Sequence, residues 1–237
     1  LFEGRVFNTH GSPLPKWRGG GGFSWRIMAG VREGRTVIHQ VTAGIDDGPL
    51  IVNEPYVFPD EIRKPLDFYN YGLRTDNTGL RAFIEALADN AAIELTPQDE
   101  SQSTYFPRLK ADLHGYIDWS WSGDELVRFI LAFSTPYPGA TTFMNGQKVN
   151  IMDARFTPDS THPHPYFNGL VYRALDDVLF VACQSGTLEV QVADIFAEDP
   201  QPKIGDRFHT PAKFLDAARE SRVTYSPSGS ATKNTTS

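Results

Sequence analysis

The chain has 237 residues, of which 40% are hydrophobic and 22% are charged, and this composition excludes a disordered, collagen-like or coiled-coil protein. The 29 Asp and Glu exceed the 22 Lys and Arg, for a formal net charge of -7, which argues against a general binder of phosphate backbones because that task needs a basic stripe. The single cysteine, Cys183, excludes an intrachain disulfide and a cysteine-based zinc site, and it favours a reducing compartment.

The sequence also lacks the patterns that direct a chain into a membrane. No apolar run reaches the roughly 18 residues of a membrane span, and Arg5, Asn8 and His10 interrupt the first apolar stretch, where a signal peptide needs continuity. We therefore expect a cytoplasmic protein with no membrane partner. The first residue is leucine rather than methionine, so we expect a processed, truncated or fragmentary start.

The first elements along the chain are short. Residues 5–8 predict a strand, which the two prolines within 12–15 end because proline donates no ladder hydrogen bond. Four glycines, Gly19 to Gly22, precede an apolar segment at 23–29 that predicts a helix. Glycines in this position allow the backbone to approach a ligand or a neighbouring element closely.

Two β-rich segments and a helical one follow. Strands are predicted over 35–41 and over 50–58, where Pro55 breaks the second, and residues 44–49 between them have turn chemistry. Apolar residues within 66–87 recur at helical spacings and predict one long helix after a proline that can open it. This alternation predicts the last part of an α/β domain.

The second half of the chain predicts a β-rich region. A polar stretch without periodicity, 96–104, predicts an inter-domain linker. A short amphipathic helix is expected over 124–133, and the Asn145-Gly146 pair favours a type I′ hairpin turn within 141–151. Three more strands are predicted over 169–174, 178–184 and 187–192. Short strands separated by turns indicate a small β-barrel or sandwich, and the Ser/Thr-rich end from 226 on is expected to be disordered.

A polar pair marks the end of the first predicted strand. Asn8 and His10 lie two residues apart, so on a strand both side chains are on one face. The strand end is where ligand crevices form in α/β folds. By itself the pair is more often a hydrogen-bonded structural group than a site, and Asp46 beside glycines is more often part of a turn.

The longer pattern around this pair is more specific. The segment from Asn8 to Gly19 runs Asn-Thr-His-Gly-Ser-Pro-Leu-Pro-Lys-Trp-Arg-Gly, and Gly-Ile-Asp-Asp-Gly-Pro follows at 44–49. In this order and at this spacing the two halves resemble the formyltransferase family that uses 10-formyltetrahydrofolate. The resemblance covers residues 5–220. Segments similar to the interdomain connection and C-terminal domain of methionyl-tRNA formyltransferases lie at 97–109, 117–120, 136–140 and 186–190.

The resemblance implies an α/β fold in two parts: the C-terminal part of a Rossmann-like formyltransferase domain, then a small OB-like β-barrel domain. It implies a catalytic part at 1–95, a linker at 96–110, an OB-like domain at 111–225 and a disordered tail at 226–237. About three α/β units of roughly 30 residues each precede the matching segment in the family. We therefore expect an incomplete copy of a longer protein, with an exposed sheet edge.

The resemblance also implies the reaction, which is transfer of a formyl group from 10-formyltetrahydrofolate to a primary amine, with folate as co-substrate and no metal. An amine attacks the formyl carbon and an oxyanion develops, so preorganised hydrogen-bond donors contribute most to the rate. Asn8 and His10 are implied as these donors. Asp46 would hold His10 in its charged form and relay a proton.

The acceptor depends on less specific features. The segment from Gly19 to Phe23, four glycines and a phenylalanine, stands where the tRNA enzymes usually have Gly-Ala-Ala-Pro-Ile, and the chain from Arg108 on is more acidic than basic. Both features favour a nucleotide-linked amino sugar over initiator methionyl-tRNA as acceptor. A non-catalytic nucleic-acid-binding module remains a third possibility. The implied folate-binding residues are Gly44, Ile45 and Asp46, and the candidate substrate-binding residues are Ser12, Lys16, Trp17, Arg18 and Gly19.

Three further features have simpler explanations than a site. His162 and His164 flank a proline without a nearby carboxylate pattern, which favours an exposed loop over a metal pair. Cys183 lies in an apolar predicted strand and is expected to be a core thiol rather than a nucleophile. Trp119 and Trp121 would share a strand face, which favours core packing over a carbohydrate or base platform.

Overall fold

The computed structural model describes residues 6–75, 78–159, 164–197, 201–226 and 229–234. The chain forms two compact units, one comprising Leu1–Arg26 and Val31–Arg108 and the other Ile27–Gly30 and Leu109–Ser237. Within the described ranges, no helix is both long and apolar enough to cross a membrane. The domain boundaries expected from the sequence stay a prediction.

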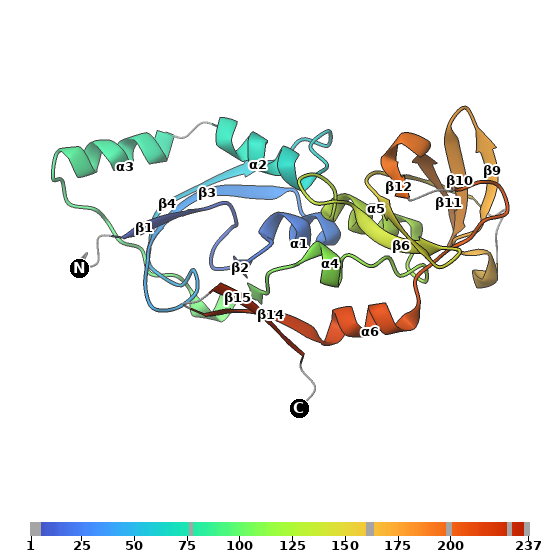
Figure 1. Cartoon of the computed structure of the whole chain (residues 1–237). Coiled ribbons are helices and arrows are strands. Elements are labelled where there is room, and N and C mark those ends of the chain that lie inside the picture. Colours follow the sequence, from blue (N-terminus) through green and yellow to red (C-terminus); the bar gives the residue numbers. More distant parts are fainter. Residues whose placement is uncertain (1–5, 76–77, 160–163, 198–200, 227–228, 235–237) are drawn as a thin grey trace. The chain divides into compact units, whose positions relative to one another are not determined.

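The first unit is built on a three-stranded sheet with the order β1-β3-β4 (Figure 1). Its strands are β1 (Phe7–His10), β3 (Glu33–Gln40) and β4 (Leu50–Val57), and both pairs are antiparallel. Pro55 lies inside β4 and does not break it, contrary to the prediction. β4 is an edge strand of this sheet, where a residue without an N–H leaves no ladder bond unmade.

The predicted helix after the glycines is confirmed as α1 (Gly22–Ala29). Arg26 on this helix is completely buried, and its guanidinium donates to the carbonyl oxygens of Gly11 and Glu33 at 2.9 and 2.8 Å. The same group lies over the rings of Phe23 and Phe58. Arg26 therefore ties α1 to the end of β1 and to the start of β3, with its charge hydrogen-bonded as burial requires.

The helix predicted over 66–87 is two helices. They are α2 (Pro65–Arg74), which begins at the predicted proline, and α3 (Thr78–Ala88). Thr75 ends α2 through a backbone bond to the carbonyl of Tyr71. Phe83 packs α3 against the buried Ile38 and Val52 of the sheet. Other apolar positions of the predicted helical face are exposed, namely Tyr69, Leu73, Ile84 and Leu87.

The segment predicted as a linker is ordered in part. Thr96 pairs with Leu50, residues Glu100–Gln102 form a short 3-10 helix, and β5 (Tyr105–Phe106) runs parallel to β2 (Arg18–Gly19). This parallel pair forms a two-stranded sheet of its own, separate from the antiparallel sheet of β1, β3 and β4. The contacts return the chain at 96–106 to the strand end near His10, which explains why a polar stretch without periodicity still has a defined path.

The second unit confirms the predicted helix and hairpin. The helix α5 (Gly123–Ala132) begins at Ser122 with a capping box to Glu125, which satisfies the free N–H groups of its first turn. The strands β6 (Ala140–Met144) and β7 (Gln147–Ile151) flank Asn145 and Gly146, both with positive φ, as a type I′ turn requires.

The predicted small β domain appears as two four-stranded antiparallel sheets with the orders β8-β11-β10-β9 and β12-β7-β6-β13. Their apolar inner positions, among them Val181, Leu188 and Val190, are buried. The mixed α/β class is therefore confirmed. The other strands of these sheets are β8 (Arg155–Pro158), β9 (Val171–Leu175), β10 (Val178–Cys183), β11 (Gly186–Gln191), β12 (Ile195–Ala197) and β13 (Phe208–His209). Of these, β8, β12 and β13 were not predicted.

Two short helices complete the second unit, α4 (Ala111–His114) and α6 (Ala212–Glu220). The end of the chain differs from the expected disordered tail. The strands β14 (Ser221–Ser226) and β15 (Gly229–Asn234) form an antiparallel hairpin. Serine and threonine suit strands as well as loops, because Thr is β-branched and a paired strand satisfies its backbone whatever its side chains.

Candidate active site

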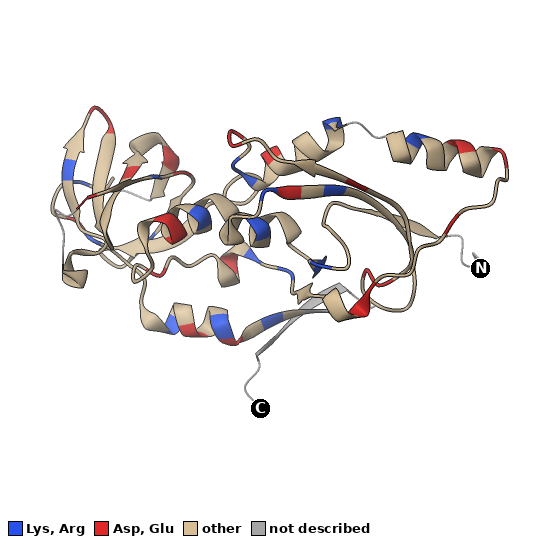
Figure 2. Cartoon of the chain, turned by 180° about the vertical axis from the view of Figure 1, so that it is seen from behind, with Lys and Arg blue, Asp and Glu red and all other residues tan. Residues whose placement is uncertain are grey.

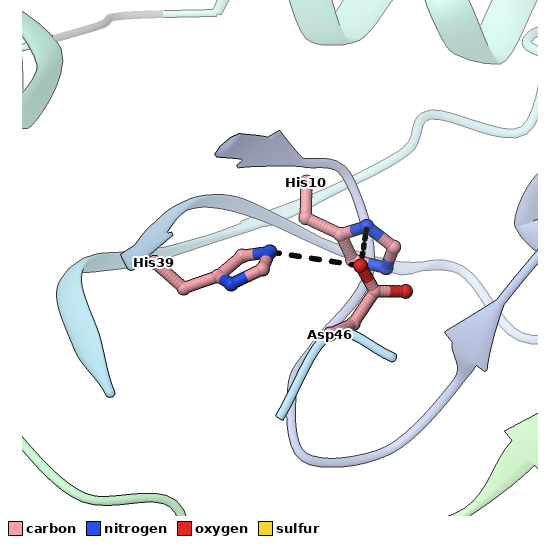
Figure 3. Close-up of side chains that lie close together, drawn as sticks. All are labelled: His10, His39 and Asp46. Atoms are coloured by element: carbon pink, nitrogen blue, oxygen red, sulfur yellow. Dashed lines mark ion pairs between the residues drawn. The ribbon is translucent and has the colours of Figure 1, made fainter. Parts of the chain in front are cut away.

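Three titratable side chains converge beside the end of β1 (Figure 3). The Nδ1 of His10 lies 3.8 Å from Oδ1 of Asp46, and the Nε2 of His39 lies 3.6 Å from the same oxygen. The amide nitrogen of Asn8 is 3.2 Å from His39 Nε2. The structure thus brings together all three predicted catalytic residues and adds a second histidine.

The register of two strands creates this cluster. In the β1–β3 pair Asn8 lies opposite His39, so their side chains share one face of the sheet with His10, two residues along β1. The β3–β4 register shifts between Ile38 and His39, which is a bulge of the kind that re-aims side chains next to sites. Asp46 arrives from the following loop with φ of 51°, a conformation that Asp tolerates.

Hydrogen bonds from Gly19 and Gln98 and a close backbone approach at Gly48 fix the loop that carries Asp46. Its carboxylate Oδ2 accepts the backbone N–H of Gly19 at 2.9 Å. The side-chain amide of Gln98 donates to the carbonyl oxygens of Asp46 and Gly48, at 2.8 and 2.7 Å. A Cβ at Gly48 would meet the carbonyl oxygen of Gln40 at 1.8 Å, so only glycine allows this close approach. Backbone and amide contacts therefore define the position of Asp46.

The protonation state expected for His10 is wrong. Burial lowers the pKa of His10 below its usual value, and this effect exceeds the opposing influence of Asp46 and of a backbone hydrogen bond with Trp17. The carboxylate is 3.8 Å away, which is too long for a direct hydrogen bond, whereas the side chain is only 15% exposed. His10 is therefore neutral at neutral pH, so any proton donor it offers is one N–H rather than an imidazolium.

The Nε2 atom of His10 is buried, and no hydrogen-bond partner for it lies in the described part of the chain. A buried polar atom in this state costs free energy unless a ligand or water satisfies it. A cavity of about 320 Å³ reaches His10 and is lined also by Thr9, Phe23, Arg35 and Tyr56. The orphaned nitrogen and the cavity together indicate a place for a bound molecule.

His39 is the functional residue that sequence analysis missed. Its Nδ1 lies 3.0 Å from the carbonyl oxygen of Gln40, which can only accept, so Nδ1 carries the proton. The Nε2 then presents a lone pair that accepts an N–H of the Asn8 amide. The cross-strand position opposite Asn8 was the available signal, but it requires the strand register. His39 orients Asn8 toward the cluster.

The predicted substrate-binding residues have different surroundings. Arg18 is buried and forms hydrogen bonds with Gln98 and a bidentate pair with Glu100 at 2.6 and 2.9 Å, which raises the pKa of Arg18. The ring of Trp17 stacks on Phe106 with 4.5 Å between centroids. Both side chains therefore have partners within the first unit, and the geometry gives no support to their predicted contact with substrate.

The other predicted contacts differ in exposure. Lys16 is exposed, whereas Ser12 is buried with its hydroxyl near Gly22. Gly19 contributes its N–H to Asp46. Of the predicted folate-binding turn, Gly44 and Ile45 are exposed beside the cluster, and Ile45 is 54% exposed despite its apolar side chain.

The remaining sequence features have structural roles where the structure describes them. Cys183 is buried, and burial raises its pKa to about 12, as expected for a core thiol. Trp119 is buried and stacks on Phe208. His162 lies outside the described residues, and His164 accepts the N–H of Tyr166 through Nδ1. The ligand atoms of His10, His39 and Asp46 lie within 4.8 Å of one another, close enough to contact one metal ion.

Comparison with known proteins identifies the family of the chain. A family model described as the formyl transferase C-terminal domain matches residues 111–200, and one described as formyl transferase matches residues 1–68. Together the two matches span more than half of the chain. The chain belongs to the formyl transferase family. The resemblance identified from the sequence motifs is thereby confirmed.

Curated relatives of this formyl transferase include methionyl-tRNA formyltransferases. That of Cereibacter sphaeroides is 30% identical over 192 residues, which is 81% of this chain and 58% of the relative. That of Stutzerimonas stutzeri is 34% identical over 187 residues, or 77% of this chain and 55% of the relative. The chain thus spans little more than half the length of these relatives.

Solved structures of similar fold include two sugar-modifying enzymes. A sugar 3N-formyl transferase studied with dTDP and 5-N-formyl-THF has a TM-score of 0.59 and 19% identity, and the match covers 83% of this chain and 66% of the other. The N-formyltransferase of Helicobacter canadensis, in complex with folinic acid and dTDP-3-aminofucose, has a TM-score of 0.56 and 22% identity, covering 79% and 66%. At these identities the likeness concerns the fold.

Proposed function

We propose that this formyl transferase moves a formyl group from 10-formyltetrahydrofolate to a primary amine. The observation that carries the proposal is the cluster of Asn8, His10, His39 and Asp46, in which the buried Nε2 of His10 has no partner among the described residues. Family membership supplies the reaction class, and the cluster supplies the groups that this reaction needs: donors toward an oxyanion and a carboxylate that accepts a proton.

The proposed reaction begins when the amine nitrogen attacks the formyl carbon. The carbon–oxygen double bond opens, and the oxygen gains a negative charge. In this proposal the neutral ring of His10 carries its proton on the buried Nε2, and this N–H and the second N–H of the Asn8 amide donate to the oxygen. Each such donor is worth about 3–4 kcal/mol of transition-state stabilisation by analogy with other oxyanion holes. The bond between the formyl carbon and N10 of the folate then breaks, and N10 takes up a proton.

Asp46 is the proton acceptor in this proposal. Its Oδ2 is held by the N–H of Gly19, which leaves Oδ1 facing His10 and His39. The attacking amine loses one proton to this carboxylate, directly or through a water molecule, and the proton is returned to the leaving nitrogen of the folate. The tight loop around Asp46 keeps the carboxylate at this position.

For the acceptor we propose a nucleotide-linked amino sugar. The residues from Arg108 on carry more acidic than basic side chains, and the glycine run at Gly19 to Gly22 differs from the loop of the tRNA enzymes. In Figure 2, the Lys and Arg positions of the described residues are interspersed along the ribbon with Asp and Glu positions, whereas a phosphate-binding surface needs its basic side chains gathered in a stripe. A small acceptor needs no such stripe, whereas a tRNA does.

Initiator methionyl-tRNA is the second candidate acceptor. The observation in its favour is that the similar curated proteins are methionyl-tRNA formyltransferases at 30 to 34% identity. Sequence likeness of this degree extends through both family segments of the chain. The two acceptors share the same reacting group, an amine, so the proposed chemistry at His10 is common to both.

The test of formyl transfer uses the full-length protein as its reading frame encodes it, with 10-formyltetrahydrofolate and both acceptors. We expect formylation of one acceptor, and we expect His10→Ala to lower kcat by about 10²–10³-fold, because one oxyanion donor is removed. The control is His209→Ala, an exposed histidine on β13 of the second unit. Normal turnover of His10→Ala, or no turnover by the wild type, contradicts the proposal.

A further inference from the structure

We propose that His10, His39 and Asp46 form a binding site for a divalent transition metal of the Zn²⁺ type. The three side chains offer two imidazole nitrogens and one carboxylate oxygen, all within 4.8 Å of one another. Imidazole favours Zn²⁺, Co²⁺ and related ions over Mg²⁺ and Ca²⁺, which prefer oxygen ligands alone. Three protein ligands also leave a fourth coordination position open.

The distances in the cluster suit such an ion. Zn²⁺ binds nitrogen and oxygen at about 2.0–2.2 Å, so two ligand atoms of a tetrahedral site lie about 3.4 Å apart. The Nδ1 of His10 and the Nε2 of His39 lie 3.8 and 3.6 Å from Oδ1 of Asp46. Shifts of a few tenths of an ångström bring these two pairs to the ideal separation, and the two imidazole nitrogens, which lie within 4.8 Å of each other, must approach by at most about 1.4 Å.

The partners of two of the ligands already have the arrangement found around metal sites. A metal-binding imidazole usually donates its other N–H to a backbone carbonyl or a carboxylate, which fixes its tautomer and orientation. The Nδ1–H of His39 donates to the carbonyl of Gln40 and leaves Nε2 available. The Oδ2 of Asp46 accepts the N–H of Gly19 and leaves Oδ1 available. Both partners are backbone atoms, so the fold itself presents the two ligands.

A bound ion would change the proposed reaction. It would occupy Oδ1 of Asp46 and displace the Asn8 amide from His39 Nε2, the atom that orients this amide. This consequence rests on the proposed function. We therefore expect Zn²⁺ to inhibit formyl transfer reversibly, because the carboxylate can no longer accept the proton and one oxyanion donor is released.

The binding test does not depend on activity. Chelator-treated full-length protein is titrated with Co²⁺, which is followed by its d–d absorption, and with Zn²⁺ by calorimetry. We expect about one equivalent to bind, with at least tenfold weaker binding in His39→Ala and in Asp46→Asn. The matched control is His164→Ala, which removes an exposed histidine of the proline-flanked pair. Absence of binding by the wild type, or binding by both cluster variants that is as tight as that of the wild type, overturns the proposal.

Two further measurements complement the binding test. X-ray absorption of the Zn²⁺-loaded wild type should show two imidazoles and a light oxygen donor, so the result does not require the variants to fold. Activity then separates the two proposals: we expect the chelated enzyme to formylate its acceptor and one equivalent of Zn²⁺ to inhibit it at least tenfold. Binding without any change in turnover contradicts the inhibition. Loss of turnover on chelation supports the site and contradicts the proposed roles of the residues alone.

Discussion

His10 shows how burial decides the chemistry of a single side chain. The ring is mostly covered, and desolvation disfavours the charged imidazolium more than the carboxylate of Asp46 favours it. The direct consequence is a lowered pKa and a neutral ring, whose Nε2 has no partner in the described chain. In the proposed reaction, Asn8, Asp46 and His39 orient donors and accept a proton, and none needs to hold a charge on His10.

The protonation state of His10 makes a prediction for the pH profile. We expect kcat/KM for formyl transfer not to fall between pH 6.5 and 8, because burial lowers the pKa of His10 and the neutral ring predominates over this range. As pH falls below the lowered pKa, protonation of His10 should begin to change the rate. The measurement is the pH–rate profile of the wild type beside that of His10→Asn, whose amide does not titrate.

A reaction rate that falls as pH rises above the pKa of His10 would identify a charged donor. If an imidazolium were required, the wild-type rate would fall about tenfold per pH unit above the pKa of His10, while His10→Asn would not show that fall. Such a result would contradict the neutral ring derived from burial and restore the role that the motif alone implies.

At the scale of elements, the site depends on a loop that distant residues hold. Asp46 lies between β3 and β4, and Gln98, more than fifty residues later, donates to two carbonyl oxygens of that loop. The backbone pair of Thr96 with Leu50 brings this segment alongside. A polar stretch with no period in sequence is therefore part of the support of the active-site carboxylate.

We expect Gln98→Ala to weaken the loop and the reaction together. Four hydrogen bonds of about 1 kcal/mol each are lost, two to the carbonyl oxygens of the loop and two from the guanidinium of Arg18, so the free energy of unfolding should fall by about 2–4 kcal/mol. Displacement of Asp46 should lower kcat about ten- to a hundredfold, because small misplacements of a catalytic group are costly. Denaturant titration and steady-state kinetics measure the two effects.

The matched control for this change is Gln102→Ala, a glutamine of the same segment whose side chain is exposed. It should leave both quantities within error. If Gln98→Ala keeps the wild-type kcat, then the two hydrogen bonds from Gln98 to the carbonyl oxygens of Asp46 and Gly48 have no part in positioning the carboxylate.

At the scale of the whole molecule, charge is the property that bears on the acceptor. The net charge is -7, and Figure 2 shows acidic and basic positions mixed over both units. Arg18, which belongs to the basic and aromatic group that was expected to bind substrate, is paired with Glu100. Long-range attraction for a polyanion is therefore weak in this chain.

The salt dependence of the reaction separates the two acceptors. For a nucleotide-linked amino sugar, which carries one or two phosphates, we expect KM to change little between low and moderate salt. For a tRNA, several neutralised phosphates would give a log–log slope of several units. The assay uses the full-length protein and each acceptor over the same salt series. A steep slope with initiator tRNA, and no turnover of amino sugar nucleotides, would promote the second candidate.

The sequence alone determined the local elements and the family. The Asn145-Gly146 turn, the capped helix after Ser122 and the helix after the glycine run were predictable because each follows from chemistry within a few residues. The ordered match from Asn8 to Gly19 and through Asp46 identified the formyl transferase family for the same reason, since a motif is a local string. Predictions failed where local rules were applied to longer segments, as in the divided helix at α2 and α3.

Tertiary structure decided the rest of the site. The partnership of His39 with Asn8 depends on strand register, and the contacts of Gln98 with the Asp46 loop depend on chain segments far apart in sequence. The pairing of Arg18 with Glu100 has the same origin. The protonation state of His10 depends on how completely the fold removes water from its ring. Burial and long-range contact are properties of the packed chain, and they set the chemistry of residues whose positions the motif had already marked.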